Sequence, residues 1–408
     1  MHRLVSGEER GVALRCFLGC LVVCLSAGGN VVAQVAEGEK SDGVVVCSEC
    51  PNVGGSTSSW HIGFSASRGW AIVAKERMLP LLEEVPWSVS VSVGRDALPT
   101  SRWASHLGFP ALSFSYRFIR LGSDRALGYA HCLYPAYRFY FLRCPWLRIS
   151  SNVGVGLGFI PKHYTQGALG YNSGVGSLVN VYIEAQLALS WRMAGGTTFG
   201  VAGDYVHMSN GGIQMPNSGL NYLFLTLSVS QAMCPVREYQ PRWPASLPLH
   251  HSLTLDAAGS IVERGLPNGK KYPLYSLAVS YFYEVAPWVT IGVLGDVYWD
   301  FSLQRESAAG NLPCQPIWKM PTVSVFAGVR LHLGRLMPEV MLGYNVYQTL
   351  SEDPRFAIRL GLRYKVTSWC QPFVSMVSKK VRANHIAFGI GVDLVEVFSA
   401  SSKGDERY

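Results

Sequence analysis

The chain has 408 residues, of which 49% are hydrophobic and 15% are charged, and its formal net charge is +8. Disordered chains carry far less hydrophobic surface, so this composition predicts a folded protein. No apolar run reaches the length of about 18 residues that a membrane-spanning helix needs. The lysines and arginines are dispersed rather than gathered in a basic run, so no nucleic-acid partner is expected.

The first 33 residues have the pattern of a secretory signal peptide. Three arginines precede an apolar core at residues 16–27, and cleavage is expected after Ala33. An uncleaved anchor helix is the less favoured alternative, because the core is too short to span a bilayer. We therefore predict an exported protein. Residues 34–59 show no regular pattern and are expected to form a flexible N-terminal extension.

The cysteines give only weak evidence for a metal site. Three of the ten cysteines lie in the signal peptide, which leaves seven, an odd number from which no pairing can be deduced. Cys47 and Cys50 form a C-x-x-C motif, but zinc sites usually need a second pair of ligands. No metal and no cofactor are therefore predicted.

From residue 60 to residue 398, polar and apolar side chains alternate with the period of two that is typical of β-strands. In the stretch from Trp87 to Val93, the odd positions are apolar and the even positions are serines. The same alternation recurs at 323–333, 356–365 and 386–394. These patterns predict an all-β protein with about 14 strands, within a range of about 12 to 16, followed by a polar tail at residues 399–408.

The composition of the polar face separates two all-β architectures. A soluble sandwich exposes a face rich in Lys, Glu and Thr, whereas the polar face of this chain is mainly Gly, Ser and scattered Arg. Such residues suit the lumen of a barrel, and continuous apolar rows suit lipid. We therefore predict one transmembrane antiparallel β-barrel over residues 60–398, in the outer membrane of a Gram-negative bacterium. A soluble sandwich is the alternative.

Two polar residues interrupt the outward apolar row of one predicted strand. From Phe199 onward the odd positions share one face, so that His207 and Ser209 lie on the face expected to meet lipid. An imidazole two residues from a hydroxyl on the same strand face can act as its base. The pair is therefore a candidate base and nucleophile, although an isolated His-x-Ser at a strand end is more often part of a loop.

The next predicted strand offers a third member. If Tyr205 pairs with Leu223, His207 faces Asn221, whose carboxamide can orient the imidazole. Glu184 and Asp204 lie at positions expected to face the lumen, so that a bulge would be needed for either to reach His207.

The turn between these strands provides candidate oxyanion donors. Asn210, Gly211 and Gly212 follow the predicted nucleophile directly, and glycines allow the main chain to approach a substrate closely.

These motifs resemble the signature of the outer-membrane lipid A 3-O-deacylase and acyloxyacyl-hydrolase-like family. The matching positions are His207, Met208, Ser209, Asn210, Gly211, Gly212, Pro216, Asn217 and Gly219. Upstream, Gly176, Ser177 and Asn180 also fit the family pattern. The resemblance is strong from Gly108 to Gln231 and weaker toward the C-terminus.

The resemblance implies metal-free hydrolysis of an acyl ester of lipid A, most readily the 3-O chain, with Ser209 as nucleophile and His207 as base. Smaller members carry Glu at the position of Asn221, so this chain departs from the family at the third member. Those members need only eight strands, which leaves the residues after Met233 unexplained. The alternative is a non-catalytic barrel, such as a porin or a scaffold.

Two further expectations concern partners. Lys162 and His163 lie on a predicted outer loop and are expected to touch the phosphates of lipid A. The sequence leaves open whether the protein forms a homodimer.

Overall fold

The computed structural model describes residues 60–72, 82–96, 103–104, 107–165, 172–233, 250–264, 267, 269–304, 316–349, 354–379 and 382–397. The predicted signal peptide, the N-terminal extension with Cys47 and Cys50, and the polar tail lie outside these residues. No helix in the described part is long and apolar enough to cross a membrane. Among the described cysteines, Cys132 and Cys370 form no disulfide.

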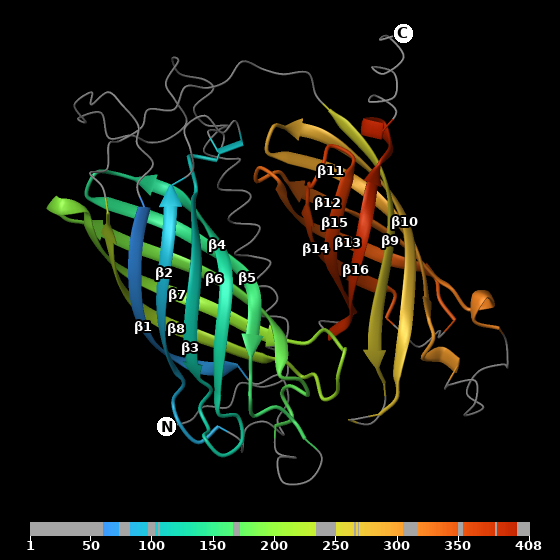
Figure 1. The fold of residues 1–408 in the computed structure, drawn as a ribbon, viewed down its shortest axis with the longest axis horizontal. Helices are drawn as coiled ribbons and strands as arrows, with labels where there is room; N and C mark the ends of the chain where they lie inside the picture. The colour runs from blue at the N-terminus through green and yellow to red at the C-terminus, as the bar shows by residue number, and fades with distance from the viewer. Residues whose placement is uncertain are drawn as a thin grey trace. The chain divides into compact units, whose positions relative to one another are not determined.

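Sixteen antiparallel strands in the described part close into two barrels of eight (Figure 1). The first consists of β1 (Trp60–Ile72), β2 (Trp87–Asp96), β3 (Ala111–Arg120), β4 (Tyr129–Arg143), β5 (Leu147–Phe159), β6 (Val179–Arg192), β7 (Thr197–Ser209) and β8 (Leu220–Ala232). The second consists of β9 (His251–Glu263), β10 (Lys271–Ala286), β11 (Val289–Asp300), β12 (Thr322–Leu331), β13 (Leu336–Tyr347), β14 (Phe356–Tyr364), β15 (Cys370–Lys379) and β16 (Arg382–Asp393). The described part also contains two short 3-10 helices, η3 (Ala194–Gly196) and η4 (Ile317–Lys319).

The all-β barrel prediction is confirmed, and sixteen strands lie at the upper end of the predicted range. The sequence predicts one barrel, whereas the structure has two. The first closes by pairing of β8 with β1, and the second closes by pairing of β16 with β9. The alternating pattern specifies that a strand has an apolar and a polar face, and it is the same in both barrels. It therefore carries no information on which strand closes the sheet.

The contacts divide the chain into two compact units that do not follow the sequence strictly. Of the described residues, those in 60–210 and 217–233 belong to the first unit, and those in 211–216 and 250–397 belong to the second. The short segment 211–216 is thus part of the second unit although it lies within the β7–β8 connection.

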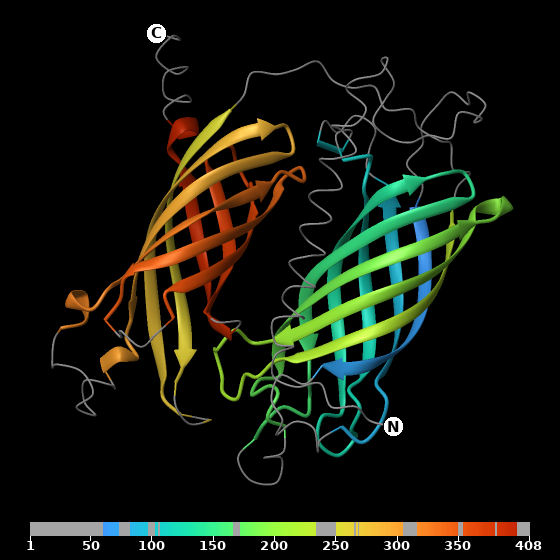
Figure 2. The same ribbon diagram turned by 180° about the vertical axis from the view of Figure 1, so that it is seen from behind.

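The wall of the first barrel is apolar outside, and its interior holds both polar and apolar side chains. In β8, Leu223, Leu225 and Leu227 are 46%, 55% and 62% exposed, whereas the intervening Phe224 and Thr226 are buried. Figure 2 shows the strands of this barrel wrapping obliquely around the closed wall, as closure of a sheet requires. Every strand has two paired neighbours, which satisfies backbone groups that lipid cannot hydrogen-bond.

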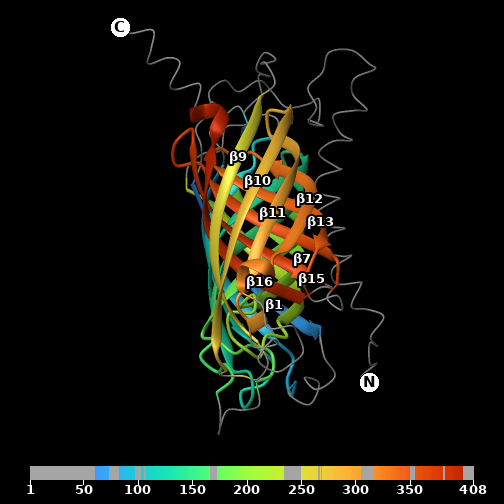
Figure 3. The same ribbon diagram turned by 90° about the vertical axis from the view of Figure 1, so that its right-hand side faces the viewer.

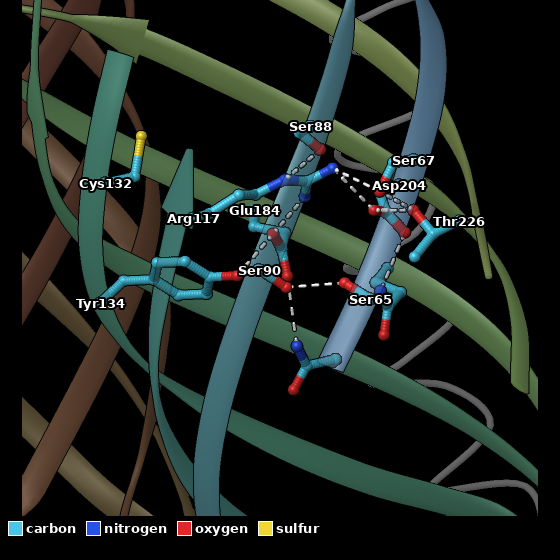
Figure 4. A network of polar contacts seen from close by, with 12 residues as sticks. Ser65, Ser67, Ser88, Ser90, Arg117, Cys132, Tyr134, Glu184, Asp204 and Thr226 are labelled. Carbon is cyan, nitrogen blue, oxygen red and sulfur yellow. Dashed lines mark hydrogen bonds and ion pairs between the residues drawn. The ribbon is translucent and has the colours of Figure 1, made fainter. Parts of the chain in front are cut away.

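The lumen of the first barrel holds a buried ion cluster (Figure 4). Arg117 pairs with Glu184 at 2.7 Å and with Asp204 at 3.1 Å. Tyr134 and Tyr182 donate hydrogen bonds to the carboxylate of Glu184 at 3.0 and 2.6 Å. The prediction that Glu184 and Asp204 face the lumen is confirmed, and both carboxylates are engaged on the side of the wall opposite to His207.

The second barrel repeats this organisation with a larger set of charges, and Figure 3 shows its strands from the side. Glu339 accepts hydrogen bonds from Arg330 and Arg363 at 3.1 and 3.0 Å. Asp296 pairs with Arg359 at 3.7 Å.

One ion pair of the second barrel lies at its rim. Asp300 pairs with Arg264 at 3.3 Å. It is the last residue of β11 and therefore lies at the rim, where Arg264, which follows β9, can reach it.

Candidate active site

The β7–β8 hairpin brings the candidate base, nucleophile and third member together. The two strands pair antiparallel with Tyr205 opposite Leu223 and His207 opposite Asn221, which is the register predicted from the sequence. His207 and Asn221 are half-buried on the outward rows of their strands. Ser209 ends β7 and is only 4% exposed, so its hydroxyl is shielded from water.

A continuous chain of hydrogen bonds joins the three side chains. Nε2 of His207 lies 2.9 Å from Oγ of Ser209, and Nδ1 lies 2.7 Å from Oδ1 of Asn221. An amide oxygen can only accept, so Nδ1 carries the proton and donates it to Asn221. Nε2 is then the unprotonated nitrogen and accepts the hydroxyl proton of Ser209. The imidazole is held in the tautomer that a general base needs.

Tyr205 adds a second donor to the third member. Its hydroxyl donates to Oδ1 of Asn221 at 2.9 Å, so this oxygen accepts from both Tyr205 and His207. The two bonds fix the rotation of the carboxamide beneath the imidazole. Sequence reasoning placed Tyr205 on the outward row of His207 but did not assign it a role, although its position two residues before His207 was the available signal.

The turn after Ser209 is braced by its own polar side chains. The N–H of Asn210 donates to Oδ1 of Asn217 at 3.1 Å, and Nδ2 of Asn210 donates to Oγ of Ser177 at 2.9 Å. Ser177 in turn donates to Asn180 at 3.1 Å. The residues Ser177, Asn180 and Asn217, which carried part of the family resemblance, therefore hold the turn in place.

The two glycines of the predicted oxyanion site have φ of 63° at Gly211 and 88° at Gly212. Residues other than glycine rarely adopt a positive φ of this kind. Both residues belong by their contacts to the second unit, whereas Ser209 and Asn210 belong to the first. Their role in holding an oxyanion stays a prediction.

Gly219, another position of the motif, lies against the imidazole. Its φ is 76°, and a Cβ atom at this position would lie 3.0 Å from Cε1 of His207. Glycine here lets the chain return to β8 closely beside the base. A small apolar pocket adjoins the third member and is lined by Ala71, Ile72, Leu82, Leu127, Leu220, Asn221 and Tyr222.

The two predicted phosphate-binding residues follow β5 and are engaged with the main chain. Nζ of Lys162 donates to the carbonyl oxygen of Asp124 at 2.5 Å. Nδ1 of His163 donates to the carbonyl oxygen of Ile160 at 3.4 Å. Both side chains are half-buried, and their contact with lipid A phosphates stays a prediction.

Comparison with solved structures gives similarities that are too low to support an inference. The outer membrane enzyme PagL shares 16% identity at a TM-score of 0.27, covering 41% of this chain and 97% of PagL. A mutant of the Rh. blastica porin shares 10% identity at a TM-score of 0.17, covering 83% of this chain and 99% of the porin. The siderophore receptor PirA from Acinetobacter baumannii shares 10% identity at a TM-score of 0.24, covering 79% of this chain and 43% of the receptor. No curated protein matches the sequence.

Two family models match the chain, one over each barrel. The model of lipid A 3-O-deacylase (PagL) matches residues 100–230, which include β7 and all of β8 except its last two residues. The model of the acyloxyacyl hydrolase C-terminal domain matches residues 251–396, the second barrel. The two matched ranges together cover more than half of the chain. The chain therefore belongs to the family of outer-membrane lipid A 3-O-deacylases and acyloxyacyl hydrolases.

Proposed function

We propose that this protein removes an ester-linked acyl chain from lipid A by a serine–histidine mechanism on the outer face of its first barrel. The observation that carries the proposal is the unbroken chain of hydrogen bonds from Ser209 through His207 to Asn221. Side chains on the outward row of a membrane barrel usually meet only lipid. Three hydrogen-bonded polar groups on such a row suggest that they bind a polar group of a lipid. The ester linkage of an acyl chain is such a group.

The first half of the reaction acylates the serine. Oγ of Ser209 attacks the carbonyl carbon of the ester while Nε2 of His207 takes the hydroxyl proton, and the carbonyl electron pair moves onto oxygen. The tetrahedral intermediate collapses, the bond to the sugar oxygen breaks, and His207 gives its proton to that oxygen. Deacylated lipid A leaves and the acyl chain stays on Ser209.

The second half returns the enzyme to its starting state. His207 takes a proton from a water molecule, whose oxygen attacks the acyl carbonyl carbon. The bond to Oγ breaks, His207 returns the proton to Oγ, and the free fatty acid leaves. In both halves Nδ1 keeps its proton and donates to Asn221, which prevents the ring from turning over.

The oxyanion of both intermediates needs donors at the hairpin end. We assign this role to Asn210, Gly211 and Gly212, which follow the nucleophile directly. The N–H and the Nδ2 group of Asn210 already donate to Asn217 and Ser177, so Asn210 has to share or exchange one of these bonds when the oxyanion forms. We assign Lys162 and His163 to the phosphates of the substrate.

An outward site suits a substrate with several fatty chains. Moving such a lipid out of the bilayer into a pocket would disturb many methylene groups, each worth about 0.8 kcal/mol. A site on the wall lets the lipid arrive laterally with most chains still in the membrane. Because Ser209 is 4% exposed, the ester has to displace neighbouring side chains at the hairpin end to reach Oγ.

The 3-O chain is the proposed position of cleavage, in line with the family model that matches the first barrel. Asn221 replaces the carboxylate expected at the third position, so the imidazolium formed in the transition state lacks a negative partner. We therefore expect slower turnover than a carboxylate would allow.

The test is mass spectrometry of lipid A extracted from cells that express the protein or its Ser209→Ala variant. The wild type is expected to remove one acyl chain, and the variant is expected to remove none. Ser218→Ala is the matched control, since this hydroxyl lies in the same connection and has no hydrogen-bond partner in the structure. Unchanged deacylation by Ser209→Ala would favour the alternative of a non-catalytic barrel.

A further inference from the structure

A second pair of polar side chains lies on the outward rows of the first barrel, on β3 and β4. Tyr116 is 39% exposed, whereas the next residue, Arg117, is buried in the lumen. His131 is half-buried on the outward row of β4, and its neighbour Cys132 is 0% exposed. The hydroxyl of Tyr116 lies 2.7 Å from Nδ1 of His131. The pair belongs wholly to the first unit and takes no part in the ester chemistry proposed above.

The pair has one more proton to donate than its own hydrogen bond uses. If Tyr116 donates to Nδ1, the proton of the neutral imidazole is on Nε2 and is left over. If Nδ1 donates to Tyr116, the hydroxyl proton is left over. Among the described residues, neither side chain has a hydrogen-bond partner other than the other member of the pair. Because both side chains are partly exposed, this spare donor can be reached from outside the wall.

The wall around the pair is aromatic. The ring of His131 lies 5.2 Å from that of Tyr129 and 5.5 Å from that of Phe118, between centroids. The ring of Phe118 lies 5.7 Å from that of Trp87. Tyrosine and tryptophan gather where the wall of a membrane barrel meets the lipid headgroups. A donor that faces hydrocarbon without an acceptor costs free energy, so at this depth an oxygen of a lipid headgroup is the expected acceptor.

Two cations lie at the rim next to the pair. Arg120 is opposite Tyr129 in the sheet, and its guanidinium binds Asp124 and lies 3.9 Å from Glu84. Nζ of Lys162 donates to the carbonyl oxygen of Asp124 at 2.5 Å. Both cations have further N–H donors, and the side chains of Asp124 and Glu84 are each 60% exposed, so water screens their charges. Cations favour a charged acceptor such as phosphate over a neutral carbonyl.

The pair is separate from the proposed catalytic groups of the same barrel. His131 pairs with Phe159, which in turn pairs with Val179 of β6. Val181, on the same row as Val179, pairs with Ser209. Three strand spacings of about 4.8 Å put the pair roughly 15 Å along the wall from Ser209. A lipid bound at the pair therefore lies beside a lipid at Ser209 and does not replace it.

We propose that Tyr116 and His131 form a binding site for the phosphate group of a membrane lipid on the outer wall of β3 and β4. The pair donates its spare proton to a phosphate oxygen, and Arg120 and Lys162 attract the phosphate to the rim. This inference goes beyond the proposed function, because it requires neither Ser209 nor the cleavage of an ester.

The test is native mass spectrometry of the full-length protein in detergent micelles, with Ser209→Ala in every sample so that no lipid is consumed. The probes are phosphatidylglycerol, lipid A, and a diacylglycerol with the same chains as the phosphatidylglycerol but no phosphate. His131→Phe keeps a ring and removes both nitrogens, and Tyr116→Phe leaves the imidazole with a proton to donate. Tyr137→Phe is the matched control, since Tyr137 lies further along the same outward row of β4.

The expected result is a fall of roughly 10-fold in the fraction of His131→Phe that carries phosphatidylglycerol, because a hydrogen bond to a charged group is lost. For lipid A the fall is read from the second bound molecule, since the serine site can hold the first. Tyr116→Phe is expected to lose about two- to threefold, and Tyr137→Phe nothing. Diacylglycerol binding is expected to stay unchanged in all variants. A loss for only one of the two phosphate lipids identifies that lipid as the source of the phosphate.

Three results would overturn the inference. They are unchanged binding of both phosphate lipids by His131→Phe, an equal loss of diacylglycerol, and an equal loss in Tyr137→Phe. If His131→Phe does not fold, the protein with an intact pair is modified with diethyl pyrocarbonate, which acylates imidazoles. Slower modification of His131 with a phosphate lipid than with diacylglycerol supports the site, and equal rates with all three lipids contradict it. Because these readouts measure binding, they are independent of whether Ser209→Ala abolishes deacylation.

Discussion

The last hairpins of the two barrels make opposite use of a histidine. In β7–β8, His207 lies on the outward row, hydrogen-bonded to Ser209 and Asn221. In β15–β16, His385 points into the lumen, is 2% exposed and lies 5.4 Å from the ring of Tyr298. In a strand, one residue of shift moves a side chain to the other face of the wall. The parity of the strand, rather than the presence of an imidazole, therefore separates a candidate site from packing.

The outward row of β15 can be compared with the outward row of β7, which carries His207 and Ser209. Val374, Met376 and Ser378 alternate with the lumen residues Ser375 and Val377, and the residues opposite the three on β16 are Phe388, Ile386 and Ala383. The comparison teaches that this hairpin of the second barrel repeats the strand architecture of β7–β8 with apolar side chains at the paired positions. The proposed nucleophile, base and third member all lie on the β7–β8 hairpin.

The largest expected effect comes from substituting each of the two histidines in turn. His207→Ala removes the base and should lower kcat for lipid A by at least about 10³-fold. His385→Phe keeps an aromatic ring against Tyr298 and should leave kcat within about threefold of the wild type. Both are measured by release of fatty acid from lipid A in detergent micelles. Comparable losses in the two variants would contradict the assignment of the reaction to the first barrel.

The next largest effect concerns the two lumens. Arg117→Met leaves Glu184 and Asp204 buried without their cation, which should destabilise the first barrel by about 3–5 kcal/mol. Arg363→Met should do the same to the second barrel, where it leaves Glu339 and Asp256 with one cation fewer. Brief proteolysis in increasing urea, with the fragments identified by mass spectrometry, shows which barrel opens. If Arg117→Met opened only the second barrel, or Arg363→Met only the first, the assignment of each ion cluster to its own barrel would be contradicted.

A smaller effect sharpens the role of the third member. Asn221→Leu removes the acceptor for Nδ1 of His207 and should lower kcat roughly 10- to 100-fold, since a hydrogen bond to a charged group is worth about 1.5–3 kcal/mol. Asn221→Asp supplies a negative partner for the imidazolium and should raise kcat severalfold. Steady-state kinetics on lipid A with both variants provide the check. A loss in the Asp variant as large as in the Leu variant would show that shape rather than charge matters at this position.

Much of the candidate site followed from the sequence, because its parts lie on one hairpin. Period-two alternation placed His207 and Asn221 on the outward rows, and the apolar row beginning at Leu223 set the register. The same alternation placed Glu184 in the lumen. These are local properties, and the structure agrees with them because neighbouring strands pair directly.

What the sequence could not predict depends on long-range pairing. The return of β8 to β1 joins residues that are far apart in the chain, and no local pattern marks that closure. The placement of segment 211–216 in the second unit depends on Glu263, about fifty residues later, which reads in sequence as an ordinary strand-end residue. Tyr205 was visible on the outward row, but its bond to Asn221 depends on side-chain length and rotamer.

The measurement that bears most directly on the central claim is capture of the acyl-enzyme. The protein is mixed with lipid A, quenched with acid within the first turnovers, and digested for peptide mass spectrometry. We predict a fatty acyl mass on the peptide that contains Ser209, with none in Ser209→Ala. Fatty acid release at the wild-type rate by Ser209→Ala, or an acyl group carried by another residue, would contradict the account.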